Sequence, residues 1–375
     1  MKQGANNVQC KSIKTSFRAW IEIDRAALRH NLHVAKRCAP KAKIMAVVKA
    51  NAYGHGIEVV VPAISKEVSY FAVASLEEAL RLRKVEVKRP VVLLSAALPS
   101  EYAAIAQHGF IPTISSYEEA CLFAKVAPLQ APIHFKINTG MGRLGMWHED
   151  ASKTLEQILA LPLFVQSIST HLPAADSDVI YTRTQLALFK KVLPALRAYA
   201  PKSMVHILNS AGILRHGTEA QDCVRMGLML YGVSPISAQQ KLLHPVMSWK
   251  TQVALITKIP KGSTISYGRT YQAARDLTVA VLPMGYADGY PWQLSGQKNF
   301  VLIHGKKVPL LGRVTMDQIM VDISRLKNVH IGDEVVLLGK QGAQEITATA
   351  LAARAGTIVW HLFTGITERV HRITK

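Results

Sequence analysis

Eight short apolar runs recur along the first two thirds of the chain and constrain its fold more than any other feature. Stretches of helical periodicity separate most of them, and two open with a capping box, at 75–78 and 116–119. Eight strands alternating with helices predict a (β/α)8 barrel, an α/β fold. A doubly wound open sheet would show the same alternation, but the count of eight and the lack of a Gly-x-Gly-x-x-Gly turn favour the barrel. The runs cover residues 44–48, 70–74, 91–95, 110–114, 133–137, 164–170, 205–208 and 224–230.

The pattern changes near Met247, where strand-like segments joined by Gly-containing turns take over. Within this last third, only 347–355 looks helical. We therefore predict a flexible basic extension over 1–18, a barrel over 19–247 and a mainly β domain over 248–375. The first strand, 19–23, is a candidate to pair with the C-terminal domain. The predicted C-terminal strands are 253–256, 277–282, 300–303, 319–323 and 334–338.

The composition indicates a soluble globular protein, with 49% hydrophobic and 19% charged residues. The apolar runs are too short to cross a bilayer, and residues 1–17 lack the apolar centre of a secretory signal. The four cysteines are scattered, without metal or redox spacing, which predicts no metal site and a reducing, cytoplasmic location.

The net charge of +20, from 45 basic and 25 acidic residues, raises the alternative of a nucleic-acid or membrane-surface binder. The basic residues are spread along the chain, without a block or an aromatic-interleaved patch. We interpret them as a solvated surface that attracts anionic ligands. A nucleic-acid binder would have to show salt-dependent binding to an oligonucleotide.

Lys49 stands where the first of the eight runs ends, and a lysine at the end of a core strand needs an explanation. It could be a snorkelling side chain, or an amine placed to form a Schiff base, with its pKa lowered by partial desolvation. In a (β/α)8 barrel the chemistry lies at the carboxyl ends of the strands. Polar residues there, after the fifth to eighth runs, are Lys136, Arg143, His171, Ser210 and Arg225.

Ser210 lies in the segment Asn-Ser-Ala-Gly at 209–212, where a helix could begin and bind a phosphate through its N–H groups. Each of these features has a structural interpretation by itself: a common turn, a solvated arginine or a core histidine. Together, an amine, a phosphate cradle and an arginine at strand ends describe a pocket for pyridoxal phosphate.

Several motifs resemble those of alanine racemases, in the family's order and spacing, from about residue 19 to 373. The most specific is AVVKANAYGHG at 46–56, which is similar to the pyridoxal phosphate signature of that family. FKINTGMGRLG at 135–145 is the longest of the others. The remaining matches are at 169–171, 230–235, 265–268, 285–291 and 312–317.

The resemblance implies two bases on opposite faces of pyridoxal 5'-phosphate, because racemisation removes a proton on one side and returns one on the other. Lys49 would hold the cofactor as a Schiff base and then act as one base. Tyr267, supplied by the partner subunit of a homodimer, would be the other. His171 would bridge Arg225 and Tyr267, and Arg225 would bind the pyridine nitrogen.

The resemblance also implies which residues bind the cofactor and the substrate. The phosphate would be bound by Tyr53, Ser210 and the N–H groups of Gly227 and Leu228. Arg143 and the Met316 backbone would bind the substrate carboxylate, with Asp317 nearby. Lys136 is often carbamylated in this family, which would let it orient Arg143. The residues that match the family's access corridor are Asp176, Tyr286 and Arg313.

The chain departs from the family at three positions. Trp360 stands where a tyrosine usually helps to hold the phosphate, and an indole has one N–H and cannot accept a hydrogen bond. Trp292 stands where arginine is common at the corridor, and Thr315 where cysteine is frequent. The two tryptophans change size and charge around the entrance and therefore bear on substrate preference.

We therefore expect a cytoplasmic, homodimeric, pyridoxal-phosphate-dependent alanine racemase that supplies D-alanine for peptidoglycan. One alternative is a racemase of the same fold with broader specificity that acts on larger amino acids. Another is a non-catalytic pyridoxal phosphate carrier, which would keep the barrel lysine but lack the β domain and Tyr267.

Overall fold

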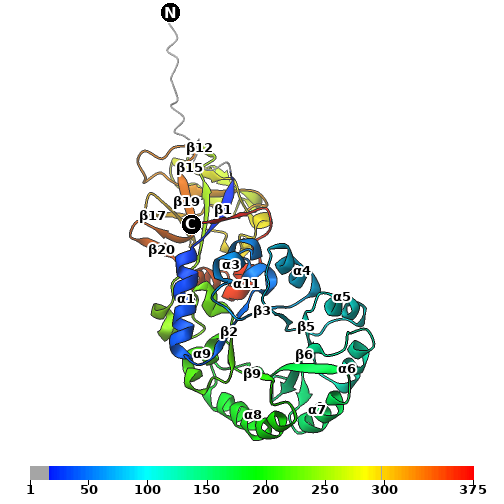
Figure 1. Cartoon of the computed structure of the whole chain (residues 1–375). Helices are drawn as coiled ribbons and strands as arrows, with labels where there is room; N and C mark the ends of the chain where they lie inside the picture. Colours follow the sequence, from blue (N-terminus) through cyan, green and yellow to red (C-terminus); the bar gives the residue numbers. More distant parts are fainter. Residues whose placement is uncertain (1–16, 297) are drawn as a thin grey trace, which may run out of the picture. The chain divides into compact units, whose positions relative to one another are not determined.

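The computed structural model describes residues 17–296 and 298–375, so most of the predicted basic extension, 1–18, lies outside the described residues. The chain divides into two compact units (Figure 1). One, called here the barrel unit, consists of Ile23–Val246 and the last two residues. The other, the C-terminal unit, consists of Met247–Ile373 with the residues up to Glu22.

The barrel unit is built on a closed sheet of eight parallel strands, which confirms the predicted (β/α)8 barrel. Each strand pairs with its neighbours along the chain, and β10 pairs with β2 to close the ring. All residues of β3, β4 and β5 are buried, as expected for strands covered on both faces. The strands are β2 (Lys43–Val47), β3 (Tyr70–Val73), β4 (Val91–Leu93), β5 (Ile111–Ile114), β6 (Ala131–Asn138), β8 (Leu163–Ser169), β9 (Met204–His206) and β10 (Cys223–Met226), and the short β7 (Met146–Trp147) pairs with β6.

Helices surround this ring, and Figure 1 shows α4 to α8 outside the strands. Two of them begin at the predicted capping boxes, where the hydroxyls of Ser75 and Ser116 accept hydrogen bonds from the backbone N–H of Glu78 and Glu119. No helix in the described ranges is both long and apolar enough to cross a bilayer. The helices are α1 (Arg25–Cys38), α2 (Lys49–Tyr53), α3 (Ile57–Ile64), α4 (Leu76–Lys84), α5 (Tyr102–Gln107), α6 (Tyr117–Ala124), α7 (Ala151–Leu159), α8 (Val179–Tyr199) and α9 (Ser210–His216).

The eighth apolar run is only partly a strand, so the prediction of a strand over 224–230 is wrong at its end. β10 stops at Met226, and Leu228–Tyr231 forms a 3₁₀ turn. The N–H groups of Gly227 and Met229 both donate to the Ser210 hydroxyl, 3.1 and 3.2 Å away, instead of to a neighbouring strand. The chain therefore turns across the end of the barrel at this point.

The C-terminal unit is mainly β. Its largest sheet has the order β17-β16-β19-β11-β1-β21, with β20 paired to β19, and β1 lies between β11 and β21. A three-stranded sheet has the order β12-β15-β18, and β13 pairs with β14. The strands are β1 (Ala19–Ile23), β11 (Met247–Gln252), β12 (Leu255–Ile259), β13 (Thr264–Ile265), β14 (Tyr271–Gln272), β15 (Leu277–Leu282), β16 (Phe300–Ile303), β17 (Lys306–Pro309), β18 (Ile319–Asp322), β19 (Glu334–Gln341), β20 (Gln344–Ile346) and β21 (His371–Thr374).

The prediction that only 347–355 is helical in this third of the chain is wrong. The predicted segment corresponds to α10 (Ala348–Arg354), but this part of the chain also contains α11 (Val359–Thr364). α10 has a capping hydroxyl at Thr347, which accepts from the N–H of Ala350. α11 begins after Ile358 without any side-chain cap and has the β-branched Val359 as its first residue, so the sequence gives no start signal.

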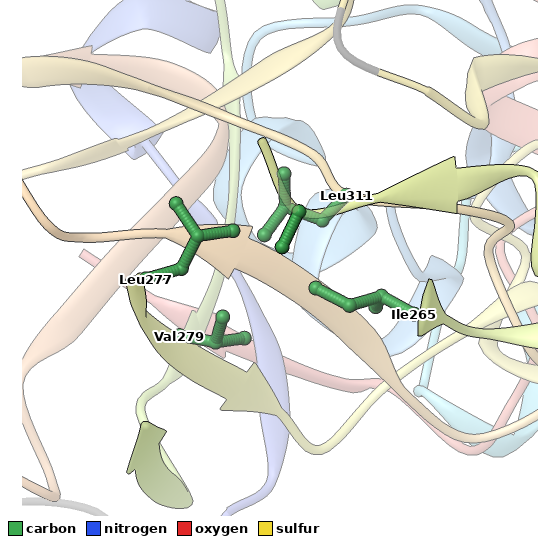
Figure 2. Packing of buried hydrophobic residues seen from close by; sticks show 5 residues of the cluster. Ile265, Leu277, Val279 and Leu311 are labelled. Atoms are coloured by element: carbon green, nitrogen blue, oxygen red, sulfur yellow. The ribbon is translucent and has the colours of Figure 1, made fainter. Parts of the chain in front are cut away.

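A small hydrophobic core supports the β13–β14 hairpin. Ile265, Leu277, Val279 and Leu311 point toward one another in Figure 2, and each is at most 6% exposed. Tyr267 lies in the loop between the two short strands of this hairpin. The packing under Ile265 therefore fixes the base of the loop that carries the predicted second base.

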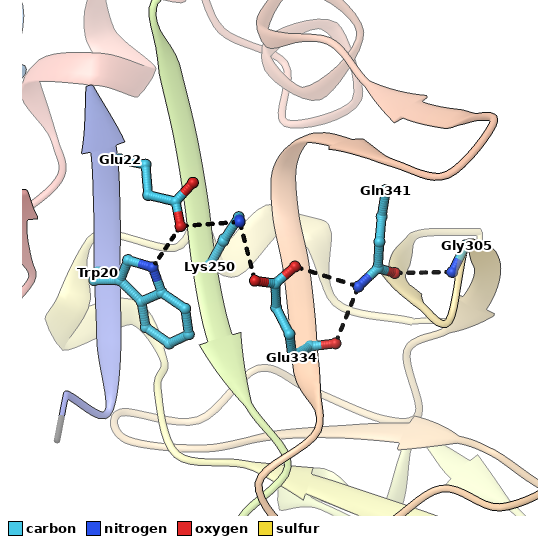
Figure 3. Close-up of polar contacts among 6 residues, drawn as sticks. All are labelled: Trp20, Glu22, Lys250, Gly305, Glu334 and Gln341. Carbon is cyan, nitrogen blue, oxygen red and sulfur yellow. Dashed lines mark hydrogen bonds and ion pairs between the residues drawn. The ribbon is translucent and has the colours of Figure 1, made fainter. Parts of the chain in front are cut away.

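The Lys250 side chain forms ion pairs that link three strands of the large sheet. Its ammonium group on β11 donates to Glu22 on β1 and to Glu334 on β19, both at 2.9 Å (Figure 3). The Lys250 side chain is 14% exposed. Burial alone would lower its pKa, but the hydrogen bonds to the two carboxylates outweigh burial and raise the pKa.

We expect Lys250→Met to destabilise the protein by about 2 kcal/mol, because it leaves two partly buried carboxylates without their shared cation. Urea unfolding at pH 7 measures this loss. The raised pKa means that the stabilisation is present below the unfolded lysine pKa and is lost as the pH rises through the folded value. Lys340→Met is the control, since Lys340 is 71% exposed and lies 3.9 Å from Glu345. Equal effects of the two variants would contradict the expectation.

Candidate active site

The predicted residues of the barrel unit gather at the carboxyl ends of its strands. Lys49 opens α2 just after β2, and Lys136 lies in β6. Ser210 opens α9 after β9, and Arg225 lies in β10. His171 follows β8, Arg143 lies in the loop between β6 and β7, and Gly227 and Leu228 follow β10.

The segment after Lys49 is a left-handed turn. Ala50, Asn51, Ala52 and Tyr53 have φ between 51° and 54°, a conformation that costs roughly 1–2 kcal/mol for each non-glycine residue. The turn buries Tyr53, whose ring centroid lies 4.9 Å from that of Tyr231. Burial raises the pKa of Tyr53 to about 12, so its hydroxyl remains a neutral hydrogen-bond donor.

The hydroxyls of Tyr53 and Ser210 converge on Gly227. A Cβ atom placed on Gly227 would lie 2.8 Å from Tyr53 Oη and 3.7 Å from Ser210 Oγ. Ser210 Oγ accepts the N–H groups of Gly227 and Met229. An anionic oxygen could take the same two donors, and only glycine leaves the required room. These residues fit a phosphate group.

Arg225 is buried among backbone carbonyls. Its Nη2 donates to the carbonyls of Thr170 and Ile207 and to His171 Nδ1, at 2.8, 2.9 and 3.1 Å. Its Nη1 donates to the carbonyl and to Nδ1 of His206, at 2.8 and 2.7 Å. Burial lowers its pKa to about 10, so the side chain is still a cation at neutral pH. Its Nε–H has no hydrogen-bond partner in the described part of the chain and can serve a ligand.

His171 is neutral, with its proton on a defined nitrogen. Burial first, and then the charges of Arg225, Lys136, Arg143 and Lys49, lower its pKa well below the ordinary value. Because Arg225 can only donate, His171 Nδ1 must accept, and the proton lies on Nε2. His171 therefore offers one N–H donor on the side away from Arg225.

The site carries a cluster of positive groups. Burial and Arg143 lower the pKa of the Lys49 amine, while Glu78 raises it, with the lowering effects dominant. Lys136 donates to Ser169 Oγ at 3.2 Å, and burial followed by Arg225 and Arg143 lowers its pKa strongly. Such a site favours an anionic ligand. The described residues contain no group of three acidic, histidine or cysteine side chains that could hold a metal ion.

Other predicted residues lie in the C-terminal unit. Tyr267 is 71% exposed. Next to it, Ser266 Oγ donates to the carbonyl of Arg313 at 2.7 Å, and the Arg313 guanidinium lies against Gly268. The same guanidinium lies 5.7 Å from the ring centroid of Trp292. Tyr267 and Arg313 are therefore neighbours in this unit.

Met316 and Asp317 belong to a loop held by a second set of contacts. The backbone N–H of Tyr286 donates to the carbonyl of Thr315 at 3.1 Å. Arg369 forms ion pairs with Asp317 at 2.7 Å and with the buried Asp288 at 3.2 Å.

The structure thus brings Tyr286, Met316 and Asp317 together. Trp360 lies in α11 and is 37% exposed. Asp176 lies in the barrel unit, in an exposed loop before α8.

Three residues with clear contacts to the site were not predicted. Thr170 and His206 hold Arg225, and Glu78 accepts the N–H of Ala50. His206 is the last residue of β9 and lies within the seventh apolar run, and a histidine at a strand end is a sequence signal for such a contact. The contact of Thr170 is made by its backbone, so its residue type gives no signal. For Glu78, the sequence indicates only a place in a capping box.

Two family models match the chain in succession. The N-terminal domain of alanine racemase matches residues 23–235, and the C-terminal domain of alanine racemase matches residues 246–374. The alanine racemase of Methylacidiphilum infernorum is 40% identical over 362 residues, covering 95% of this chain and 92% of that protein. The alanine racemase of Halothermothrix orenii is 39% identical, covering 95% and 96%.

Solved structures of alanine racemases are similar to the chain over nearly its whole length. That of Clostridium difficile 630 has a TM-score of 0.91 and 32% sequence identity, covering 96% of this chain and 97% of the other. That of Bacillus anthracis, solved with bound L-Ala-P, has a TM-score of 0.88 and 32% identity, covering 96% of each chain.

We expect the Lys49 amine to react at lower pH than an ordinary lysine, because burial and Arg143 disfavour its charged form. Reductive methylation over a pH series, followed by mass spectrometry, gives the midpoint for Lys49, with the exposed Lys153 as internal control. Arg143→Gln should raise the Lys49 midpoint, since it removes a neighbouring cation. An unchanged midpoint would show that Arg143 has no influence on the amine.

Proposed function

Since the chain belongs to the alanine racemase family, an isomerase family, we propose that it interconverts L-alanine and D-alanine with pyridoxal 5'-phosphate as cofactor. The observation that carries the proposal is the placement of the Lys49 amine at the same barrel end as the Tyr53–Ser210–Gly227 cradle and the buried Arg225. An aldehyde-bearing phosphate ester that binds there has an amine to attach to.

The residues present fit that cofactor. Its phosphate would be bound by Tyr53, Ser210 and the N–H groups of Gly227 and Leu228. Trp360 could add one N–H donor. Arg225 would direct its unpartnered Nε–H at the pyridine nitrogen. When bound, the cofactor draws electrons from the substrate's α-carbon and makes its proton removable.

Arg225 would limit how strongly the ring withdraws electrons. With a pKa of about 10 it donates a hydrogen bond but no proton at neutral pH. Arg225 would therefore leave the ring nitrogen unprotonated, and charge left on the substrate by proton removal would be stabilised only weakly. Rapid return of a proton is favoured over side reactions, as a racemase requires.

Lys49 would move a proton on one face of the substrate and the partner subunit's Tyr267 on the other. The His171 Nε2–H, fixed by Arg225 at Nδ1, would donate to the oxygen of that tyrosine and stabilise its deprotonated form. This arrangement requires a homodimer in which each active site takes residues from both chains.

The substrate carboxylate would be bound by Arg143 and by the partner's Met316 backbone, with Asp317 nearby. The lowered pKa of Lys136 favours its neutral amine, which would react with carbon dioxide and release a proton to give a carbamate. That anion would lie beside Arg143 and orient it. Asp176, Tyr286 and Arg313 would line the access corridor. The domain limits 19–247 and 248–375 are part of the same proposal.

We further propose that the enzyme works in the cytoplasm and supplies D-alanine for peptidoglycan. A second candidate is a racemase of broader specificity, because the half-exposed Trp292 and Trp360 change the size and charge of two family positions. Rates on alanine, serine and lysine in one assay distinguish the two. A faster rate on lysine than on alanine would favour the second.

Lys49→Ala should abolish both the visible absorbance of bound cofactor and the formation of D-alanine from L-alanine, because it removes the amine proposed to attach the cofactor and to move the proton. Absorption spectra and a D-alanine assay, with and without added cofactor, measure both. The control is Lys153→Ala, an exposed lysine on α7. Retained turnover in Lys49→Ala would overturn the proposed function.

Tyr267→Phe should stop racemisation but leave the exchange of the α-proton through Lys49. The equilibrium constant between enantiomers is one, so net rates must fall in both directions, by about a hundredfold or more. Proton exchange is more informative: in D₂O, D-alanine should still exchange its α-proton through Lys49, while L-alanine should not. Proton NMR of each enantiomer measures this.

Tyr271→Phe, in the same hairpin, is the control for that variant. Equal loss of exchange from both enantiomers would argue against opposed bases. Mixing Lys49→Ala with Tyr267→Phe chains tests the shared site, because a hybrid dimer would contain one intact pair of bases. Activity should reappear on mixing, and its absence would count against a tyrosine borrowed from the partner.

A further inference from the structure

The capping boxes that open α4 and α6 are alike in sequence and differ in one contact. In each, a serine hydroxyl accepts from the glutamate N–H, and one glutamate oxygen accepts the N–H of the residue four positions earlier. For Glu78 that residue is Ala74, at 2.8 Å, and for Glu119 it is Ser115, at 2.6 Å. Helix capping is therefore satisfied equally in both.

The second carboxylate oxygen of Glu78 forms a hydrogen bond to a residue outside α4. It accepts the N–H of Ala50, the residue directly after Lys49. In the part of the chain that the structure describes, the Glu119 carboxylate accepts no hydrogen bond other than the one from Ser115. The Glu78 carboxylate therefore links the end of β3 to the beginning of the left-handed turn.

That turn needs support from its surroundings, since four successive non-glycine residues occupy a disfavoured conformation. α4 supplies a further contact three residues later. Arg81 donates to Asn51 Oδ1 at 3.0 Å and is itself held by Glu58, at 2.8 Å. Asn51 Oδ1 also accepts the N–H of Ile57 at 3.0 Å. One face of α4 thus holds the turn at both Ala50 and Asn51.

We propose that Glu78 is a positioning residue for Lys49, whose carboxylate fixes the turn that directs the Lys49 amine and the Tyr53 hydroxyl toward the cofactor. The inference rests on the proposed function and adds a residue that does not itself touch cofactor or substrate. Glu78 also carries the negative charge that faces Lys49. The titratable or charged groups facing Lys49 are Arg143 from the β6–β7 loop, His171 from the loop after β8 and Glu78 from α4, and Glu78 also faces Tyr231.

Glu78→Gln tests the proposal because an amide has one oxygen where the carboxylate has two. The glutamine amide oxygen can accept a hydrogen bond from the N–H of Ala74 or of Ala50, but a second oxygen for the other N–H is missing. The amide also carries no negative charge. Glu119→Gln is the matched control, since one oxygen satisfies its single acceptor role. Glu78→Asp keeps the charge but shortens the reach.

Cofactor titration of each variant, followed by the absorbance of the bound cofactor, is the first measurement. We expect the dissociation constant to rise about tenfold in Glu78→Gln, a rise in Glu78→Asp as well, and little change in Glu119→Gln. The second measurement is the methylation midpoint of Lys49 in cofactor-free protein. It should move to lower pH in Glu78→Gln, because removal of a nearby anion disfavours the ammonium form, and should stay near the wild-type value in Glu78→Asp.

Thermal unfolding shows that the variants are folded, and we expect Glu78→Gln and Glu119→Gln to melt within a few degrees of each other. Equal cofactor affinity and equal Lys49 midpoints in those two variants would overturn the role of Glu78. Failure of the proposed function would look different, because the wild-type chain itself would then show no absorbance of bound cofactor.

Discussion

The burial of Arg225 in the barrel is the interaction on which the rest of the site depends. Its guanidinium binds the carbonyls of Thr170, His206 and Ile207, and so joins the ends of β8 and β9 to β10. A buried cation without a carboxylate is costly, and several carbonyl dipoles offset that cost. The same contacts fix the proton of His171 and leave Nε–H for a ligand. The Arg225 side chain therefore links the strand ends, sets the tautomer of His171 and provides a donor for a ligand.

The concentration of positive charge explains the protonation states of the site. Lys49, Lys136, Arg143 and Arg225 lie at one end of the barrel, and burial together with mutual repulsion lowers the pKa values of the two lysines. Only the neutral form of an amine can attach to an aldehyde, and a lowered pKa increases the fraction of Lys49 in that form. The same charges attract a phosphate or a carboxylate. The electrostatics that would prepare the nucleophile would thus also bind the ligand.

The barrel and the position of Lys49 could be predicted because both leave local signals, namely eight short apolar runs and a lysine directly after one of them. Other features have no such signal. The left-handed turn contains no glycine at Ala50, Asn51 or Ala52, and α11 has no side-chain cap. Arg225 is held largely by backbone carbonyls, which every residue type possesses. Glu78 and Glu119 occupy equivalent positions of two similar capping boxes, so only the fold shows which of them reaches the turn after Lys49.

A racemase needs proton-transferring groups on two faces of one carbon, and this requirement gives a reason for two compact units. Residues at the carboxyl ends of barrel strands are all anchored to one rim, so Lys49, Lys136 and Arg225 approach a ligand from the same support. A base for the opposite face of the substrate carbon has to come from a part of the protein other than these strand ends. Tyr267 meets that condition: its hairpin rests on a hydrophobic core of its own, and Tyr267 is 71% exposed although Ile265, two residues earlier, is buried. An exposed tyrosine on a hairpin that packs on its own hydrophobic core suits a group that acts on a ligand bound to another chain. The proposed two-base reaction and the proposed dimer therefore depend on each other.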